Sequence, residues 1–209
     1  MESFRFLPIP PISEADTQWT YTMRRDMQEI VPNLYLGPYG AAMRSKLDNL
    51  QLHGITHIVC IRQAIEAAFV KPNFPEFFRY LVLDIADSVT ENIIQHFPKV
   101  RDFIDECFRC GGKVLVHGNA GISRSAALVI AYIMERYGLP YREAFLYVQQ
   151  KRFCINLNEG FAQQLKEYEP IYRAKLTLEN GQPSMQTGHL KRKMDDDVYE
   201  MRTDFLDTS

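Results

Sequence analysis

Hydrophobic and β-branched residues gather in short runs that predict strands. These runs lie at residues 33–37, 55–61, 79–85 and 113–117, and the compact pattern begins near residues 29–31. Each run is bounded by glycine, proline or polar residues, which is typical of a strand between turns.

Apolar residues at helical spacing predict the helices between and after these strands. They lie at 41–52, 90–110, 124–137, 141–151 and 159–174. Pro98 either kinks the second of these helices or marks the start of its second half. Because strands alternate with helices, we expect an α/β fold with a single domain. Its mostly parallel, mixed central sheet should have about five strands, flanked by helices on both faces.

Changes in composition divide the chain into three parts. Residues 1–27 form an N-terminal arm in which Pro8, Pro10 and Pro11 favour an extended start. Residues 28–175 hold the pattern of strands and helices and form the domain. Residues 176–209 are polar and charged, with little to bury, so we expect a disordered tail.

Composition and charge exclude several classes of protein. The 209 residues are 46% hydrophobic and 24% charged, which suits one core of roughly 150 residues. The net charge of −2 lacks the basic surplus of a nucleic-acid binder. The longest apolar run, 126–134, is shorter than the roughly 18 residues of a membrane span, and the N-terminus does not resemble a secretory signal. We expect a protein of the cytoplasm and nucleus that binds neither nucleic acid nor membranes. Lys191–Lys193 is either a weak nuclear-import signal or part of a solvated tail.

The four cysteines are expected to be free and structural. They are Cys60, Cys107, Cys110 and Cys154, in a chain without a secretory signal. Cys107 and Cys110 form a C-x-x-C pair, but no second pair stands at zinc-site spacing. The pair also falls at the end of a predicted helix rather than at its start. We therefore expect no metal site and no cofactor.

The segment 114–125 carries the candidate chemistry. It consists of a buried strand, a loop of small residues and the start of a helix, and such an arrangement makes a cradle for an anion. The small residues at 120–121 let the backbone approach a ligand closely, and Arg124 offers a planar fork for phosphate oxygens. Ser123 and Ser125 add hydroxyl groups, either for capping or for the ligand. The alternative is an ordinary strand–loop–helix turn with a surface arginine.

This segment resembles the signature of a known enzyme family. The run His117-Gly118-Asn119-Ala120-Gly121-Ile122-Ser123-Arg124-Ser125 is similar to the H-C-x-x-G-x-x-R-[ST] signature of cysteine-dependent protein phosphatases, closest to the dual-specificity branch. Residues 33–37 resemble the opening strand of that family. The closing helix is matched by Asn158, Phe161, Gln164, Leu165, Tyr168 and Glu169. The resemblance covers roughly residues 28–175 and implies a phosphatase-like fold.

Gly118 is the departure from the family pattern. Active relatives have a cysteine here, whose thiolate attacks phosphorus, and glycine has no side chain with which to do so. The resemblance therefore implies a pseudophosphatase, not an enzyme, with no functional catalytic residue. It also implies that phosphate is held by residues 118–124, namely Gly118, Asn119, Ala120, Gly121, Ile122, Ser123 and Arg124.

The resemblance assigns further roles around the loop. Asp87, 31 positions before Gly118, matches the general acid of the family and is here vestigial, with Asp84 as the rival position. His117 and Ser125 support the loop. We expect His117 to hydrogen-bond the loop backbone and Ser125, with no thiolate to stabilise, to make a local hydrogen bond.

The expected function is to bind phosphorylated Tyr, Thr or Ser in partner proteins without turnover, shielding or anchoring them in signalling. MAP kinases are candidate partners by family analogy alone. One alternative is a scaffold that binds partners through its outer surface and whose pocket is incidental. Another is an enzyme with a different nucleophile. The candidate nucleophiles of such an enzyme are Cys60, which lies on a neighbouring strand, and the loop serines, which lack an adjacent base.

Overall fold

A computed structural model describes residues 6–13 and 18–179. Its centre is a five-stranded sheet in the order β1-β2-β5-β3-β4. The strands are β1 (Gln28–Val31), β2 (Leu34–Pro38), β3 (Ile55–Arg62), β4 (Arg79–Asp84) and β5 (Lys113–Gly118). All neighbouring strands pair in parallel except β1 and β2, which are antiparallel. The predicted mixed and mostly parallel sheet is confirmed.

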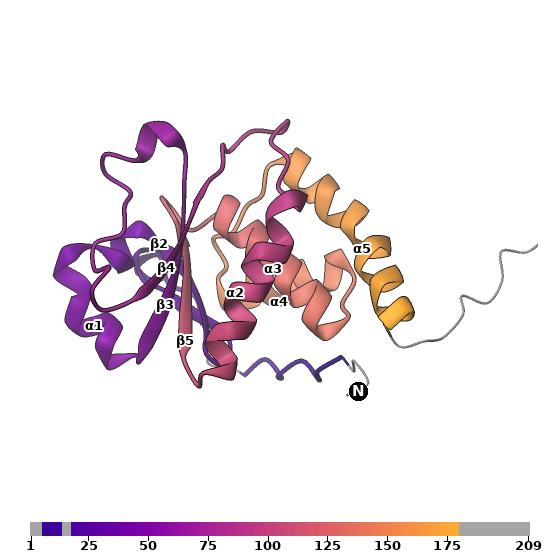
Figure 1. Cartoon of the computed structure of the whole chain (residues 1–209), viewed down its shortest axis with the longest axis horizontal. Helices are drawn as coiled ribbons and strands as arrows, with labels where there is room; N and C mark the ends of the chain where they lie inside the picture. Colours follow the sequence, from indigo (N-terminus) through magenta and orange to yellow (C-terminus); the bar gives the residue numbers. More distant parts are fainter. Residues whose placement is uncertain (1–5, 14–17, 180–209) are drawn as a thin grey trace, which may run out of the picture.

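Helices cover both faces of the sheet unequally. They are α1 (Leu47–Leu52), α2 (Phe97–Arg109), α3 (Arg124–Tyr137), α4 (Tyr141–Lys151) and α5 (Glu159–Glu179). Figure 1 shows α1 on one side of the sheet and α2–α5 on the other. Alternate strand residues face the two sides, as the pleat requires. Val114 and Val116 of β5 pack with the large helical cluster, whereas Leu115 packs with the smaller cluster near α1.

Helix α3 lies at the centre of the larger layer. Nearly all of its side chains are buried, and it packs against α2, α4 and α5. This explains why its apolar residues cover most of its girth. Because α3 starts where β5 and the loop after it end, the best-packed elements of the fold position that loop.

Two predicted helices differ from the observed ones. The segment predicted as the helix 41–52 starts with two 3₁₀ turns, η3 (Tyr39–Ala42) and η4 (Arg44–Lys46), because the extended backbone at Met43 interrupts it. The predicted helix 90–110 becomes regular only at Phe97, after the turn η6 (Ile94–His96). Pro98 lies in the first turn of α2, where its missing N–H costs no helical hydrogen bond, so it starts the helix rather than kinking it.

The chain beyond the predicted domain boundaries also has structure. In the arm, Leu7 N–H donates to the Arg136 carbonyl at 3.3 Å, and Ile9 and Ile12 pack against the larger core cluster. At the other end α5 continues to Glu179, five residues past the predicted end at Ala174. The rest of the predicted tail, with Lys191–Lys193, lies outside the described residues.

All four cysteines are free thiols, as expected from the sequence. Cys107 is buried near the end of α2 and Cys110 is exposed just after it. Within residues 6–13 and 18–179, no group of three or more His, Cys, Asp or Glu side chains is placed to hold a metal ion. The same part of the chain contains no helix that is long and apolar enough to cross a membrane.

Candidate functional site: a phosphate-binding loop

The loop between β5 and α3 encloses a small cavity of about 110 Å³. Its lining consists of Asp87 and the residues from Gly118 to Ser125. The structure thus brings together the residues 118–124 that the sequence predicts for phosphate, along with Asp87 and Ser125. His117 lies behind this lining and is completely buried.

The backbone of the loop has its carbonyl groups turned outward. The carbonyls of residues 119–122 all accept hydrogen bonds from outside the loop. The donors are Tyr39 N–H to Asn119 (3.1 Å), Arg152 Nη2 to Ala120 (3.3 Å), Arg152 Nε to Gly121 (2.9 Å) and Asn156 N–H to Ile122 (3.0 Å). The peptide bonds are all trans, so each N–H points opposite to the carbonyl of its own peptide unit. The N–H groups of residues 120–123 therefore face inward and form a cradle of four donors for an anion.

Arg152 fastens this cradle to the N-terminal segment. It is 0% exposed, and besides the two loop carbonyls it donates to the carbonyls of Arg24 and Asp26 and to the Gln28 side chain. No carboxylate of the described residues lies within ion-pair distance of its guanidinium. Arg152 consequently places a buried positive charge behind the loop. The sequence analysis missed this residue, because nothing near it in the chain indicates a partner.

Gly121 is required by the shape of the loop. Its φ of +68° lies in the left-handed region, which disfavours residues with a side chain. A Cβ at this position would also lie 2.3 Å from the Gly37 carbonyl oxygen of β2. The close approach of the loop to β2 therefore excludes any side chain at position 121.

Arg124 presents one edge of its guanidinium to the cavity. Nη1 donates to Glu66 Oε2 at 2.6 Å and to the Ile85 carbonyl at 3.2 Å, and Nη2 donates to Glu66 Oε1 at 3.1 Å. These bonds use three of the five N–H donors of an arginine. The Nε–H and one Nη2–H remain, and together they form the side-on fork that pairs with two oxygens of a phosphate.

Glu66 is a second residue that the sequence analysis missed. It belongs to the short turn η5 (Ala64–Glu66), and its carboxylate also accepts from Asn119 Nδ2 at 3.1 Å and from Gln63 N–H at 2.6 Å. The hydrogen bond from Arg124 lowers the pKa of Glu66 below its ordinary value. Glu66 therefore holds both ends of the loop, although it lies more than fifty residues before it.

Asp87, rather than Asp84, belongs to the cavity. Its Oδ1 accepts from Ser123 Oγ and from Asn158 Nδ2, both at 2.8 Å, and its Oδ2 lies 4.0 Å from Arg124 Nε. Asp84 instead pairs with Arg62 at 3.1 Å and does not line the cavity. The family position of the general acid is thus filled by a carboxylate that faces the free edge of Arg124.

His117 is a neutral structural residue at neutral pH. Burial lowers its pKa to about 4. Its Nδ1 lies 3.4 Å from the Gly118 carbonyl oxygen, and its ring contacts that of Tyr39. The expected contact with the loop backbone is present, but it is long.

The expectation for Ser125 was wrong. Ser125 is 1% exposed, and its Oγ makes no hydrogen bond with any described residue, whereas we expected a local one. Position 118 explains this, because a Cβ placed on Gly118 would meet Ser125 Oγ at 3.3 Å. The hydroxyl thus points at the space that the family cysteine would fill.

Cys60 does not replace the missing nucleophile. It is completely buried in β3, and burial raises its pKa to about 11. At neutral pH it is therefore a thiol, which is a poor nucleophile.

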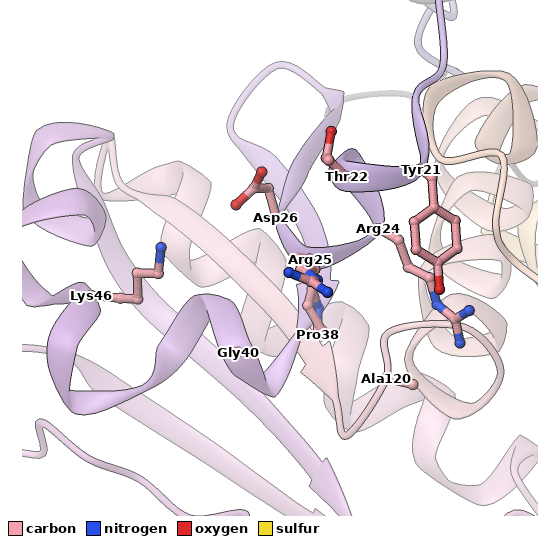
Figure 2. A pocket seen from close by; sticks show the side chains of 9 residues that line it. All are labelled: Tyr21, Thr22, Arg24, Arg25, Asp26, Pro38, Gly40, Lys46 and Ala120. Carbon is pink, nitrogen blue, oxygen red and sulfur yellow. The ribbon is translucent and has the colours of Figure 1, made fainter.

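A wider pocket of about 610 Å³ adjoins the loop at Ala120 (Figure 2). Three cations line it, Arg24, Arg25 and Lys46, against a single acidic residue, Asp26. Figure 2 shows Arg24 and Arg25 on the η2 side (Tyr21–Arg25), with Lys46 across from them. The surface beside the cradle is therefore positively charged.

Comparisons with known proteins show the family of the chain. The family model described as dual specificity phosphatase, catalytic domain, matches residues 34–171. The chain is 61% identical to serine/threonine/tyrosine-interacting protein A of Xenopus laevis, over 92% of this chain and 91% of that protein. It is 60% identical to the human serine/threonine/tyrosine-interacting protein, over 96% of this chain and 92% of that protein.

A solved structure shows the same likeness. The crystal structure of the human tyrosine phosphatase-like serine/threonine/tyrosine-interacting protein is 68% identical and has a TM-score of 0.70. The match covers 71% of this chain and 99% of that one. The chain is therefore a phosphatase-like regulatory protein that belongs to the dual-specificity phosphatase family, among its serine/threonine/tyrosine-interacting proteins.

Proposed function

We propose that this protein binds phosphorylated Tyr, Thr or Ser side chains of partner proteins in the cradle and does not hydrolyse them. The observation that carries the proposal is the outward orientation of the carbonyls of residues 119–122, which leaves four N–H groups facing the cavity. The free edge of Arg124 adds two charged donors. Such a set of donors suits a phosphate dianion.

Gly118 removes an opposing charge from this site. A thiolate and a phosphate about 4 Å apart repel by roughly 4 kcal/mol at an effective dielectric near 20. The extra backbone freedom of a glycine opposes ordering by only about 1 kcal/mol. The larger effect favours binding, so loss of the nucleophile should retain or improve phosphate affinity.

The same substitution accounts for the proposed lack of catalysis. The loop contains no cysteine, Cys60 is a buried thiol, and Ser125 Oγ has no hydrogen-bond partner among the described residues. Ser123 donates to the Asp87 carboxylate, and a carboxylate is a weaker base than the imidazole that commonly activates a serine. Binding without turnover would shield a phosphorylated residue from true phosphatases or hold its protein in place. The name of the relatives describes an interaction with serine, threonine and tyrosine, and this supports the proposal for the present chain.

The identity and location of the partners are further proposals. Family analogy makes the Thr-x-Tyr loop of MAP kinases the first candidate. We also propose residence in both cytoplasm and nucleus, which imaging of a tagged full-length chain would test.

The decisive experiment is calorimetric titration of the protein with a phosphotyrosine peptide and with its unphosphorylated twin. We expect binding that depends on the phosphate and that falls by at least about a hundredfold in Arg124→Ala. Arg124→Lys keeps the charge but loses the fork, so its affinity for the phosphopeptide should lie between those of the wild type and Arg124→Ala. Arg44→Ala removes an exposed arginine of η4 outside the cavity and should bind like the wild type.

The opposite result is equally clear. Equal affinity for the two peptides would make the cavity incidental and the protein a scaffold that uses its outer surface. Release of phosphate by the wild type would contradict the proposed lack of catalysis.

A further inference from the structure

Ser125 is a buried polar group that no described residue satisfies. It lies in the first turn of α3 and lines the cavity, yet its Oγ has no hydrogen-bond partner within residues 6–13 and 18–179. A buried hydroxyl without a partner is costly, and native proteins leave few of them. The site therefore calls for a partner from outside the chain.

The direction of the hydroxyl indicates where that partner lies. A Cβ on Gly118 would be 3.3 Å from Ser125 Oγ and 3.7 Å from the Ile61 carbonyl oxygen. With glycine at position 118, no side chain separates this hydroxyl from the cavity. An oxygen atom that enters this space a few tenths of an ångström nearer to Oγ than the Cβ position would be within hydrogen-bonding reach, because O–H···O bonds span roughly 2.5–3.0 Å.

We propose that Ser125 is a phosphate ligand specific to the Gly118 form of the loop. The phosphoryl group of the partner sits toward the floor of the cavity, and one of its oxygens enters the space beside Gly118 and accepts a hydrogen bond from Ser125 Oγ. This inference rests on the proposed function, since it adds a donor to the same site. The ligand class is a phosphate monoester dianion, held by the loop N–H groups, Arg124 and Ser125.

The proposal gives Ser125 a different role from the one implied by the family signature. There the hydroxyl faces a thiolate, whereas here it contacts the ligand itself. Its contribution should therefore depend on the residue at position 118. Any side chain there would separate the hydroxyl from the phosphate and remove the contribution.

The test is calorimetric titration of the full-length protein with inorganic phosphate and with the phosphotyrosine peptide. Ser125→Ala should lower the affinity for both ligands by about tenfold, as expected for loss of a hydrogen bond to a charged group. Ser45→Ala, which removes an exposed hydroxyl on η4 outside the cavity, should bind like the wild type. Thermal unfolding without phosphate should show Ser125→Ala to be at least as stable as the wild type.

A second variant gives an independent measurement. Gly118→Ala places a Cβ in the space beside Ser125, so it should also weaken phosphate binding severalfold. Adding Ser125→Ala to Gly118→Ala should then lower phosphate affinity by less than about twofold further, because the two changes remove the same contact. Fully additive effects would overturn the inference, as would unchanged binding by Gly118→Ala.

Failure of this inference is distinguishable from failure of the proposed function. In one outcome the wild type binds the phosphopeptide but not its twin, while Ser125→Ala binds the phosphopeptide equally well. In that case the hydroxyl is no ligand, and the loop N–H groups and Arg124 bind the phosphate without it. If the wild type itself does not discriminate between the peptides, the proposed function fails first and Ser125 loses its ligand with it.

Discussion

Glu66 and Arg124 form a buried ion pair that decides which edge of the arginine faces the cavity. Their contacts of 2.6 and 3.1 Å join two side chains that are only 11% and 9% exposed. Because Glu66 takes the end of the guanidinium, the side-on edge stays free for a ligand. The buried Glu66 carboxylate thus balances the charge of Arg124, with Asp87 4.0 Å from its free edge and an anion in the cavity as a further source of negative charge.

The first prediction concerns the loss of that carboxylate charge. Glu66→Gln keeps the shape of the side chain but leaves Arg124 without its buried partner, so the protein should lose on the order of 3 kcal/mol of stability. A bound phosphate then supplies the missing negative charge, so stabilisation by phosphate should exceed that of the wild type. Thermal unfolding with and without phosphate measures both effects.

The control for this prediction is Glu76→Gln, which removes an exposed glutamate that does not line the cavity. It should change neither stability nor the effect of phosphate. A Glu66→Gln variant as stable as the wild type, with the same response to phosphate, would show that the pair does not hold Arg124.

The second prediction concerns Asp87, whose Oδ2 lies 4.0 Å from the free edge of Arg124. Its negative charge opposes a bound dianion. Asp87→Asn keeps an oxygen that accepts from Ser123 and Asn158 while it removes the charge, so phosphopeptide affinity should rise on the order of fivefold. Asp84→Asn, at the rival position paired with Arg62, should change affinity less than about twofold. Unchanged or weaker binding by Asp87→Asn would refute the repulsion argument.

The sequence predicts the parts of this site that are contiguous. Residues 117–125 carry the strand, loop and helix signals within one short segment, so both the cradle and its position follow from local pattern. The helices 124–137 and 141–151 were predicted with their observed bounds, because apolar spacing and Gly138 or Pro140 define them. The strand β1 was not predicted separately, since its four residues carry too short a pattern.

The supporting residues were not predictable in the same way. Glu66, Tyr39 and the pair Arg152 and Asn156 contact the loop from three distant places in the chain. Each contact is made by a backbone group or a single charged side chain that has no periodic neighbours. Only the tertiary fold brings them together. The missing partner of Ser125 also required the structure, because sequence alone gives no geometry for an empty position beside a glycine.

The third prediction concerns the charged pocket of Arg24, Arg25, Lys46 and Asp26 beside Ala120. Its positive excess should favour phosphopeptides with acidic residues near the phosphorylated side chain. Arg25→Glu should weaken binding of such a peptide by about tenfold at low salt, and less at high salt, while a peptide with neutral flanks changes little.

The matched control for the charged pocket is Arg44→Glu, an equal change of charge on η4 outside it. It should leave the preference for acidic flanks in place. Equal wild-type affinity for acidic and neutral phosphopeptides would mean that the pocket does not contact the bound segment.

The fourth prediction concerns pH and His117. Burial lowers the pKa of this histidine to about 4 in the folded state, whereas an unfolded histidine titrates near 6.5. Between these values the unfolded chain binds a proton that the folded chain does not, so stability falls as the pH is lowered. Protonation of His117 alone should lower the free energy of unfolding by about 3 kcal/mol between pH 7 and pH 4.

Urea unfolding at several pH values tests this dependence. His117→Gln should show a shallower loss of stability between pH 6.5 and pH 4, whatever its stability at pH 7. His53→Gln, at the end of α1, should keep the wild-type slope. A wild-type slope in His117→Gln would assign the acid sensitivity to other groups.

The fifth prediction restores the family nucleophile. A Cβ on Gly118 meets nothing closer than Ser125 Oγ at 3.3 Å, which a shift of that side chain by a few tenths of an ångström relieves, so the loop has room for a cysteine. The surrounding N–H groups and Arg124 should lower the pKa of the new thiol, and Asp87 faces the place where a leaving group departs. Gly118→Cys should therefore hydrolyse an aryl phosphate at least about a hundredfold faster than the wild type.

Two further variants separate the parts of this restored activity. Gly118→Cys with Asp87→Asn should lose on the order of a hundredfold in kcat with a poor leaving group, because the general acid is gone. Gly118→Cys with Arg124→Ala should be inactive at any pH. A folded Gly118→Cys protein without turnover would mean that the loop, although its carbonyls are held outward, no longer aligns a nucleophile with phosphorus. In that case the change from catalysis to binding involved more of the loop than position 118.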